Sequence, residues 1–425
     1  AYQHGDHATA ARLAPLAEHA YFNNMAERLA DMPAEGKRSI LPVEAVRQHH
    51  QTCAPATLTA LGRYWSKPVD HQEVVQEICY GGTSAQKERV WAEEHGFLAR
   101  EFRVTAESTA ALIDRGVPFA LETQGTDWGH LQTIVGYDTR MGTFLVRDPS
   151  NLMRGECLAQ GLLDACQSSG PRGMAIVPRE QAHLLEGIEL SDERLFDLSY
   201  RLRRAMEGHD RDGAQQLLNE MRALEPNHWL TIDARARLAH YDTDSATLLN
   251  CAEHLLRKFP DTGRFLVSKL NCLTDLAGRE DRLAFLKEIC DGPASEPIFW
   301  QRYAGELADD AREHGVAASW LRRAIRARPS DGASYRMLAD IRWAQRLREE
   351  ALDLYRFAAC LEETNEECSK AYFAASRHLK QTDVALSFLD DRFGRFAGRS
   401  SRPALTLCWA YDELDRIPEA FDVLD

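Results

Sequence analysis

A cysteine, Cys53, stands where a polar loop gives way to a run of helix-forming residues. The positive end of a helix dipole favours the thiolate form of a cysteine at a helix N-terminus. A thiolate nucleophile also needs a base, a group that orients this base, and hydrogen-bond donors for an oxyanion. The sequence around Cys53 therefore predicts a reactive thiol whose partners come from other parts of the N-terminal half.

A histidine and an aspartate lie on two short apolar runs further along the chain. His130 enters the alternating run 131–137, and Asp148 lies at the end of the next run, 143–146. Residues near the ends of neighbouring strands can meet across a hairpin. We therefore expect Asp148 to orient the imidazole of His130, which in turn takes the proton of Cys53.

Gln48 precedes Cys53 by five residues and offers its side-chain amide as an oxyanion donor. The backbone N–H of Cys53 would be the second donor. On the residues alone, a buried structural cysteine and a strand-end histidine remain a full alternative, because cysteine, histidine and aspartate occur in most chains.

The order and local contexts of these residues resemble the peptidase C39 family. The shared features are Gln-x4-Cys-x-Pro-Ala at 48–56, Gly-His at 129–130 followed by Val-Gly-Tyr-Asp at 135–138, and Asp-Pro at 148–149. The resemblance covers residues 40–180. The family has a papain-like fold and includes the leader-peptide-cleaving domains of bacteriocin exporters.

This resemblance implies a cysteine peptidase that cleaves a peptide or protein substrate. Cys53 would be the nucleophile, His130 the base, Asp148 the orienting acid and Gln48 the oxyanion donor. Ala54 stands where the family usually has glycine. Two alternatives use the same residues or fold: an enzyme that transfers the acyl group to another acceptor, and a peptide-binding adaptor without catalysis.

Helical and strand-like segments surround these residues in a fixed order. Helix patterns near 53–65, 70–79 and 83–95 are followed by short apolar runs typical of strands. Helices first and strands later predict an α+β domain. The strand-like runs are 97–104, 118–122, 131–137, 143–146 and 174–177.

Strand patterns vanish after residue 189, and pairs of helices take over. Pro226 and Pro260 lie 34 residues apart, and Pro329 follows 69 residues after Pro260. A 34-residue helix–turn–helix period is the signature of tetratricopeptide repeats, of which we expect about six or seven; a helical bundle without a repeat is the alternative. Small and aromatic residues occupy positions that this repeat uses: Gly305, Ala317, Ala324, Tyr335, Leu338, Ala339, Ala351, Tyr355 and Ala358.

Three regions follow from these patterns. Residues 1–36 have apolar residues at helical spacings and are typical of the end of a truncated helical repeat. Residues 37–188 are expected to form a papain-like α+β cysteine peptidase domain of the C39-like type. Residues 189–425 are expected to form an all-α tetratricopeptide-type solenoid that binds the substrate or a protein partner on its concave face.

Composition limits the possible partners. The net charge is −14 and no basic run is present, which argues against nucleic-acid binding. No apolar segment approaches the ~20 residues needed to span a membrane. The ten cysteines lack the spacing of a metal site, which is typical of free thiols in a reducing bacterial cytoplasm. We expect no cofactor, since neither a phosphate-binding glycine loop nor an HExxH motif is present.

Overall fold

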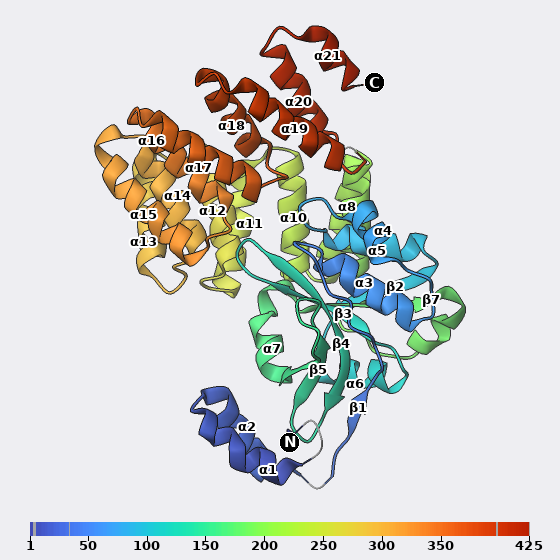
Figure 1. Cartoon of the computed structure of the whole chain (residues 1–425). Coiled ribbons are helices and arrows are strands. Elements are labelled where there is room, and N and C mark those ends of the chain that lie inside the picture. The colour runs from blue at the N-terminus through green and yellow to red at the C-terminus, as the bar shows by residue number, and fades with distance from the viewer. Residues whose placement is uncertain (3–5, 34, 397, 425) are drawn as a thin grey trace. The chain divides into compact units, whose positions relative to one another are not determined.

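The computed structural model describes residues 1–2, 6–33, 35–396 and 398–424. Its contacts divide the chain into two compact units, Ala1–Ala234 and Arg235–Asp425 (Figure 1). The parts of the predicted helical segment and of the predicted solenoid that fall on residues 3–5, 34, 397 and 425 lie outside the described residues.

A seven-stranded antiparallel sheet forms the centre of the first unit. Its order is β2-β7-β3-β4-β5-β6, and the short β1 pairs with the end of β4. Five strands match the apolar runs expected from the sequence, which confirms the α+β fold class, whereas β1 and β6 carry no such pattern. The strands are β1 (Arg38–Ile40), β2 (Phe97–Arg103), β3 (Phe119–Gln124), β4 (Gly129–Asp138), β5 (Thr143–Arg147), β6 (Gly155–Leu158) and β7 (Arg172–Pro178).

Helices build a hydrophobic core on each face of this sheet. On β7, Met174 and Ile176 point into one core and Ala175 and Val177 into the other, as the period-two alternation of a strand requires. Residues 54–62 of the helix that begins at Cys53 are all buried, because that helix is apolar or small on nearly every side. The first core contains α3 (Cys53–Tyr64), α4 (His71–Ile78) and α5 (Ala85–Glu94), and the second contains α6 (Ala106–Asp114) and α7 (Ala159–Ala165).

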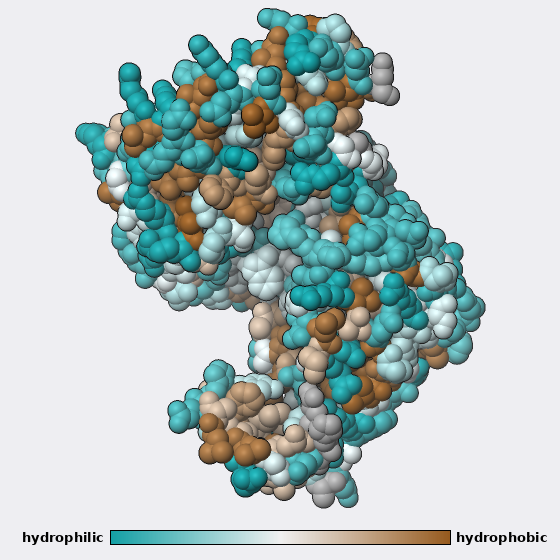
Figure 2. Space-filling model, in the orientation of Figure 1, coloured by the Kyte–Doolittle hydropathy of each residue, from teal (hydrophilic) through white to brown (hydrophobic). Residues whose placement is uncertain are grey.

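The N-terminal segment is helical, as expected, and contacts β6 and the turn between β4 and β5. The guanidinium of Arg28 donates to the carbonyl of Met141 at 3.0 Å. Leu13, Leu16 and Phe22 remain exposed, and Figure 2 shows apolar residues gathered over this segment. Its elements are α1 (His7–Leu13), the 3-10 helix η2 (Ala14–Ala17) and α2 (Ala20–Ala30).

Seven helix pairs follow the sheet in the described part of the chain. The first helices of the five middle pairs begin at Trp229, Gly263, Pro297, Gly332 and Glu366, so successive units are 34 or 35 residues apart. This period confirms the tetratricopeptide-type repeat. The pairs are α8 (Glu193–Glu207) with α9 (Arg211–Leu224), α10 (Trp229–Tyr241) with α11 (Ser245–Lys258), α12 (Gly263–Leu276) with α13 (Arg279–Asp291), α14 (Pro297–Ala308) with α15 (His314–Ala327), α16 (Gly332–Ala344) with α17 (Arg348–Leu361), α18 (Glu366–His378) with α19 (Thr382–Phe396), and α20 (Arg402–Asp412) with α21 (Ile417–Asp422).

The division by contacts places α8 and α9 in the first unit, together with the sheet. The domain boundary expected after residue 188 therefore stays a prediction.

Small residues let the helices of the repeat approach closely. Ala317, Ala324, Ala351 and Ala358 are completely buried. A Cβ on Gly332 would lie 2.8 Å from the carbonyl oxygen of Ala358, a distance that a side chain cannot adopt without moving that backbone. Only residues with little or no side chain fit at these crossings, which explains the small-residue pattern in the sequence.

A buried network of charges joins the sheet to α5. The guanidinium of Arg172 on β7 lies 2.8 Å from the carboxylate of Glu88, 2.6 Å from that of Glu101 and 3.1 Å from that of Glu122. These residues come from α5, β2 and β3, so one arginine holds three carboxylates from three other elements. Burial raises the pKa of Glu88 to about 7 against the opposing attraction of Arg172.

Arg172→Met is expected to destabilise the fold by about 3–5 kcal/mol, because it leaves the buried carboxylates of Glu88 and Glu101 and the half-buried one of Glu122 without their shared cation. Glu88→Gln leaves Arg172 with two carboxylates and should change the free energy of unfolding by about 1 kcal/mol or less. Urea unfolding of the two variants measures this contrast, and equal losses would contradict the account.

The raised pKa of Glu88 makes the stability of the fold depend on pH. The folded state holds the proton more tightly than the unfolded chain. The contribution of Glu88 to the free energy of unfolding is therefore complete below its ordinary pKa and is lost as the pH rises through about 7. Glu88→Gln should therefore flatten the fall of the free energy of unfolding over this pH range.

Candidate active site

Cys53 is the first residue of α3, and Thr52 is its N-cap residue. No side chain of the described residues caps this helix, so its first N–H groups stay available to a ligand. One turn later, the hydroxyl of Thr57 donates to the carbonyl of Leu131 at 2.9 Å. This bond fixes the first turn of α3 against β4, directly beside His130.

The pairing of β4 with β5 brings His130 and Asp148 together. The last paired residues are Thr133 and Arg147, and continuing this register sets Asp148 opposite Gln132. His130 is then the diagonal neighbour on the same face, within reach of a side-chain contact. The Nε2 atom of His130 lies 2.8 Å from Oδ1 of Asp148. The hairpin contact expected from the sequence is therefore present.

The other side of the imidazole faces the thiol. The thiol of Cys53 interacts with the imidazole of His130, and since Nε2 is used by Asp148, Nδ1 is the nitrogen left for the sulfur. The interaction with Cys53 is the largest influence on the pKa of His130 and raises it; burial opposes this rise, and Asp148 adds to it. The imidazolium form of His130 is thus stabilised from both sides.

Ser150 holds the carboxylate of Asp148 and was not indicated by the sequence analysis. Its backbone N–H donates to Oδ1 of Asp148 at 2.8 Å and its hydroxyl to the same oxygen at 2.5 Å. Burial raises the pKa of Asp148, but the hydrogen bonds from Ser150 and His130 outweigh it, so the pKa is lowered. The signal in the sequence is Asp-Pro-Ser, in which an aspartate accepts from the backbone two residues on.

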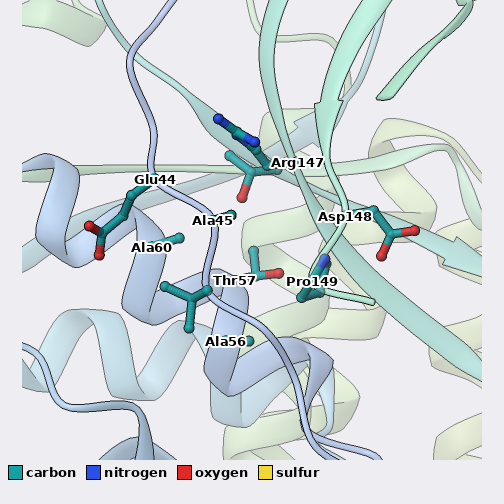
Figure 3. Close-up of a pocket in the computed structure, with 10 residues that line it drawn as sticks. Glu44, Ala45, Ala56, Thr57, Ala60, Arg147, Asp148 and Pro149 are labelled. Atoms are coloured by element: carbon teal, nitrogen blue, oxygen red, sulfur yellow. The ribbon is translucent and has the colours of Figure 1, made fainter. Parts of the chain in front are cut away.

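A strap of residues 41–52 leads to Cys53 and is held by several hydrogen bonds. Arg147 donates from Nε to the carbonyl of Val43 at 3.0 Å, and the N–H of Gln48 donates to the carbonyl of Pro149 at 2.9 Å. Figure 3 shows that Arg147 points towards the strap while Asp148 points away from it, as successive residues of a strand do. The strap and the loop after β5 are therefore tied together next to the site. The cavity drawn in Figure 3 has a volume of only ≈ 10 Å³ and is no substrate pocket.

The side chain of Gln48 is half-buried, and its Oε1 is buried without a hydrogen-bond partner in the described part of the chain. An amide end left unpaired in this way costs free energy unless a ligand pairs with it. For Gln48 to donate to an oxyanion, the amide must turn so that Nε2 takes the place of Oε1. The two ends are nearly equal in shape, so the turn needs little room.

Exposed apolar side chains lie close in the sequence to His130 and Asp148. Trp128, two residues before His130, is 54% exposed, and Leu152 and Met153 follow Asp148 with 56% and 65% exposure. Large apolar groups that remain exposed are suited to contacts with a partner molecule. Among the described residues, no group of three or more side chains could hold a metal ion, and no helix is long and apolar enough to cross a bilayer.

Four of the other cysteines are buried or half-buried thiols with raised pKa values. All ten cysteines are free thiols. Burial raises the pKa of Cys157, Cys166 and Cys290 to about 11, and that of Cys368 to about 12. These four thiols are therefore poor nucleophiles near neutral pH.

Comparison with known protein families gives a match over the region that contains Cys53, His130 and Asp148. Residues 40–159 match the model of the Peptidase_C39 like family. No curated protein matches the sequence.

Several solved structures share part of the fold. The peptidase domain of Streptococcus ComA, a bi-functional ABC transporter, is similar at 16% identity with a TM-score of 0.28, covering 32% of this chain and 99% of that domain. PilW, a type IV pilus biogenesis factor, is similar at 14% identity with a TM-score of 0.38, covering 51% of this chain and 100% of PilW. Pseudomonas aeruginosa PilF is similar at 13% identity with a TM-score of 0.38, covering 53% and 97%.

The family model spans Cys53, His130 and Asp148, and the helix pairs lie outside it. Residues 40–159 are therefore similar to the Peptidase_C39 like family and form part of a peptidase-like domain, and a region of tetratricopeptide-type helix pairs follows it.

Proposed function

We propose that the protein is a cysteine peptidase with Cys53, His130 and Asp148 as its triad. The observation that carries this proposal is the position of the His130 imidazole, which is hydrogen-bonded to Asp148 through Nε2 and interacts with the thiol of Cys53. A nucleophile, a base and an orienting acid in this order form the arrangement that thiol peptidases use.

The reaction begins when the Cys53 thiolate attacks the carbonyl carbon of a peptide bond. A sulfur–carbon bond forms and the electron pair of the carbonyl moves to its oxygen. Collapse of this intermediate breaks the carbon–nitrogen bond, and the imidazolium of His130 gives its proton to the leaving amine. His130 then takes a proton from water, which attacks the thioester and breaks the sulfur–carbon bond, releasing the acid and restoring the thiolate.

Two groups are proposed to bind the oxyanion. The backbone N–H of Cys53 belongs to the uncapped start of α3, and Gln48 would add its side-chain amide after the turn described above. Fixed donors of this kind stabilise the transition state more than the substrate. The repeat region is proposed to bind the substrate or a protein partner. A reducing compartment, such as the bacterial cytoplasm, would keep the thiol free.

Substitution of the triad tests the proposal. Cys53→Ala should abolish cleavage, and His130→Ala should nearly do so because the thiol loses its base. Gln48→Ala should lower kcat about 10²-fold or more if the amide binds the oxyanion. Cleavage is measured by mass spectrometry of peptides incubated with each variant. Full activity of Cys53→Ala would contradict the proposal that this protein is a cysteine peptidase.

A thiol-directed probe tests activation without a known substrate. Cys360 is exposed whereas Cys53 is only half-exposed, so access alone favours Cys360. We expect Cys53 to react faster, and His130→Ala to slow Cys53 but not Cys360. Faster labelling of Cys360 would favour a non-catalytic adaptor. Product analysis with added amines distinguishes hydrolysis from acyl transfer.

The pH profile tests the roles of Asp148 and Ser150. Activity should fall at alkaline pH as His130 loses its proton, and Asp148 helps to raise the pKa of His130. Asp148→Asn should therefore move the alkaline limb of kcat/KM to lower pH. Ser150→Ala should move it in the same direction by less, and should have no further effect in the Asp148→Asn protein.

Asn151→Ala is the matched control for this experiment. The Asn151 side chain accepts from the N–H of Met153 in the same loop and does not bind the carboxylate of Asp148. A limb that moves equally in Asn151→Ala would assign the effect to the loop as a whole.

A further inference from the structure

Two successive repeat units carry stacked side chains at equivalent positions. The helices α15 and α17 begin at His314 and Arg348, 34 residues apart, so Arg322 and Arg323 correspond to Arg356 and Phe357. The helices α14 and α16 begin 35 residues apart, at Pro297 and Gly332, and this makes Trp300 equivalent to Tyr335. These four helices are labelled in Figure 1.

A flat group lies on the aromatic ring of the first helix in both units. The guanidinium carbon of Arg323 lies 3.8 Å from the ring centroid of Trp300 and 5.0 Å from that of Trp320. The rings of Phe357 and Tyr335 are stacked with centroids 6.0 Å apart and an interplanar angle of 25°. Equivalent positions of two successive units thus carry the same kind of stacked pair.

This surface is exposed and positively charged. Phe357 is 59% exposed, and Arg322, Arg323 and Arg356 are exposed beside it. Within the described residues, none of these three arginines forms an ion pair with a carboxylate, although Asp353 is exposed one turn before Arg356. Elsewhere in the same region, arginines are neutralised, as in the pairs Arg282–Glu306, Arg336–Asp340 and Arg342–Glu350.

The helix α15 is unusual in a chain with a net charge of −14. Its sequence, HGVAASWLRRAIRA, contains three arginines and no acidic residue. Arg322 and Arg326 lie on the same side of the helix, one turn apart. Charge that the protein itself leaves unmatched is available to a partner of opposite charge.

We propose that the stacked strip, formed by Trp300, Arg322, Arg323, Tyr335, Arg356 and Phe357, binds an acidic segment of a protein partner that also carries apolar side chains. Carboxylates would pair with the arginines, and an apolar side chain would cover Phe357. Tryptophan, tyrosine and arginine are the residues that most often supply the affinity of protein interfaces. A nucleic acid fits less well, because the charge of the whole chain repels a polyanion at long range.

The inference rests on the binding role proposed for the repeat region and not on the thiol chemistry. The full-length Cys53→Ala protein therefore serves for all binding experiments, and probe labelling of Cys53 in the unmodified protein tests the chemistry separately.

The experiment compares short fluorescein-labelled probes by fluorescence anisotropy. The first probe is a peptide in which pairs of glutamates alternate with pairs of leucines, the second has glutamine in place of glutamate, and the third is a single-stranded RNA. The glutamate peptide should bind at least about tenfold more tightly than the glutamine peptide, and its Kd should rise with salt. Equal binding of the two peptides, or tighter binding of the RNA, would overturn the proposal.

Variants locate the binding on the strip. Arg322→Gln combined with Arg356→Gln should raise the Kd of the glutamate peptide about tenfold. Phe357→Ala should raise the Kd of both peptides about fivefold or more. Arg302→Gln, an exposed arginine of α14 two residues from Trp300 and so on another side of that helix, is the matched control and should have no effect.

Charge reversal gives a second, independent readout. The protein with Arg322→Glu and Arg356→Glu should no longer bind the glutamate peptide. It should instead bind the same peptide with lysine in place of glutamate. If this variant has the circular dichroism of the parent and still binds the glutamate peptide, the strip is not the binding surface.

Discussion

The pairing of β4 with β5 is the constraint on which the candidate site depends. His130 and Asp148 meet because the register places them diagonally on one face, and a slip of one residue would turn them to opposite faces of the sheet. The same strand also positions Cys53, the proposed nucleophile, since Thr57 of α3 donates a hydrogen bond to the carbonyl of Leu131. A single hairpin therefore sets the positions of all three side chains of the proposed triad.

Other contacts keep this hairpin and the nucleophile loop from moving independently. Gln48 is tied through its backbone to Pro149, and Arg147 binds the strap at Val43. In the same unit, Arg172 joins β7 to carboxylates of α5, β2 and β3. The arrangement suits chemistry that needs fixed distances, because little reorganisation remains for the moment of reaction.

Much of this could be predicted from local sequence, and the rest depends on contacts between distant residues. The five strands with apolar alternation were evident, whereas β1 and β6, with three and four residues, are too short to carry a periodic pattern. The order of Cys53, His130 and Asp148 suggested a triad, but the bonds from Ser150 and Arg147 depend on the turn and on the strap. Nothing local indicates that Arg172 is buried among carboxylates, since a lone arginine in a strand looks like a surface residue.

The repetition of the stacked strip has a mechanical consequence. A ligand that contacts Arg322 in one unit and Arg356 in the next spans the distance between two units. Its affinity therefore depends on this distance as well as on the chemistry of the surface. The repeat would thus select partners by the spacing of their carboxylates, and partners with another spacing would bind more weakly.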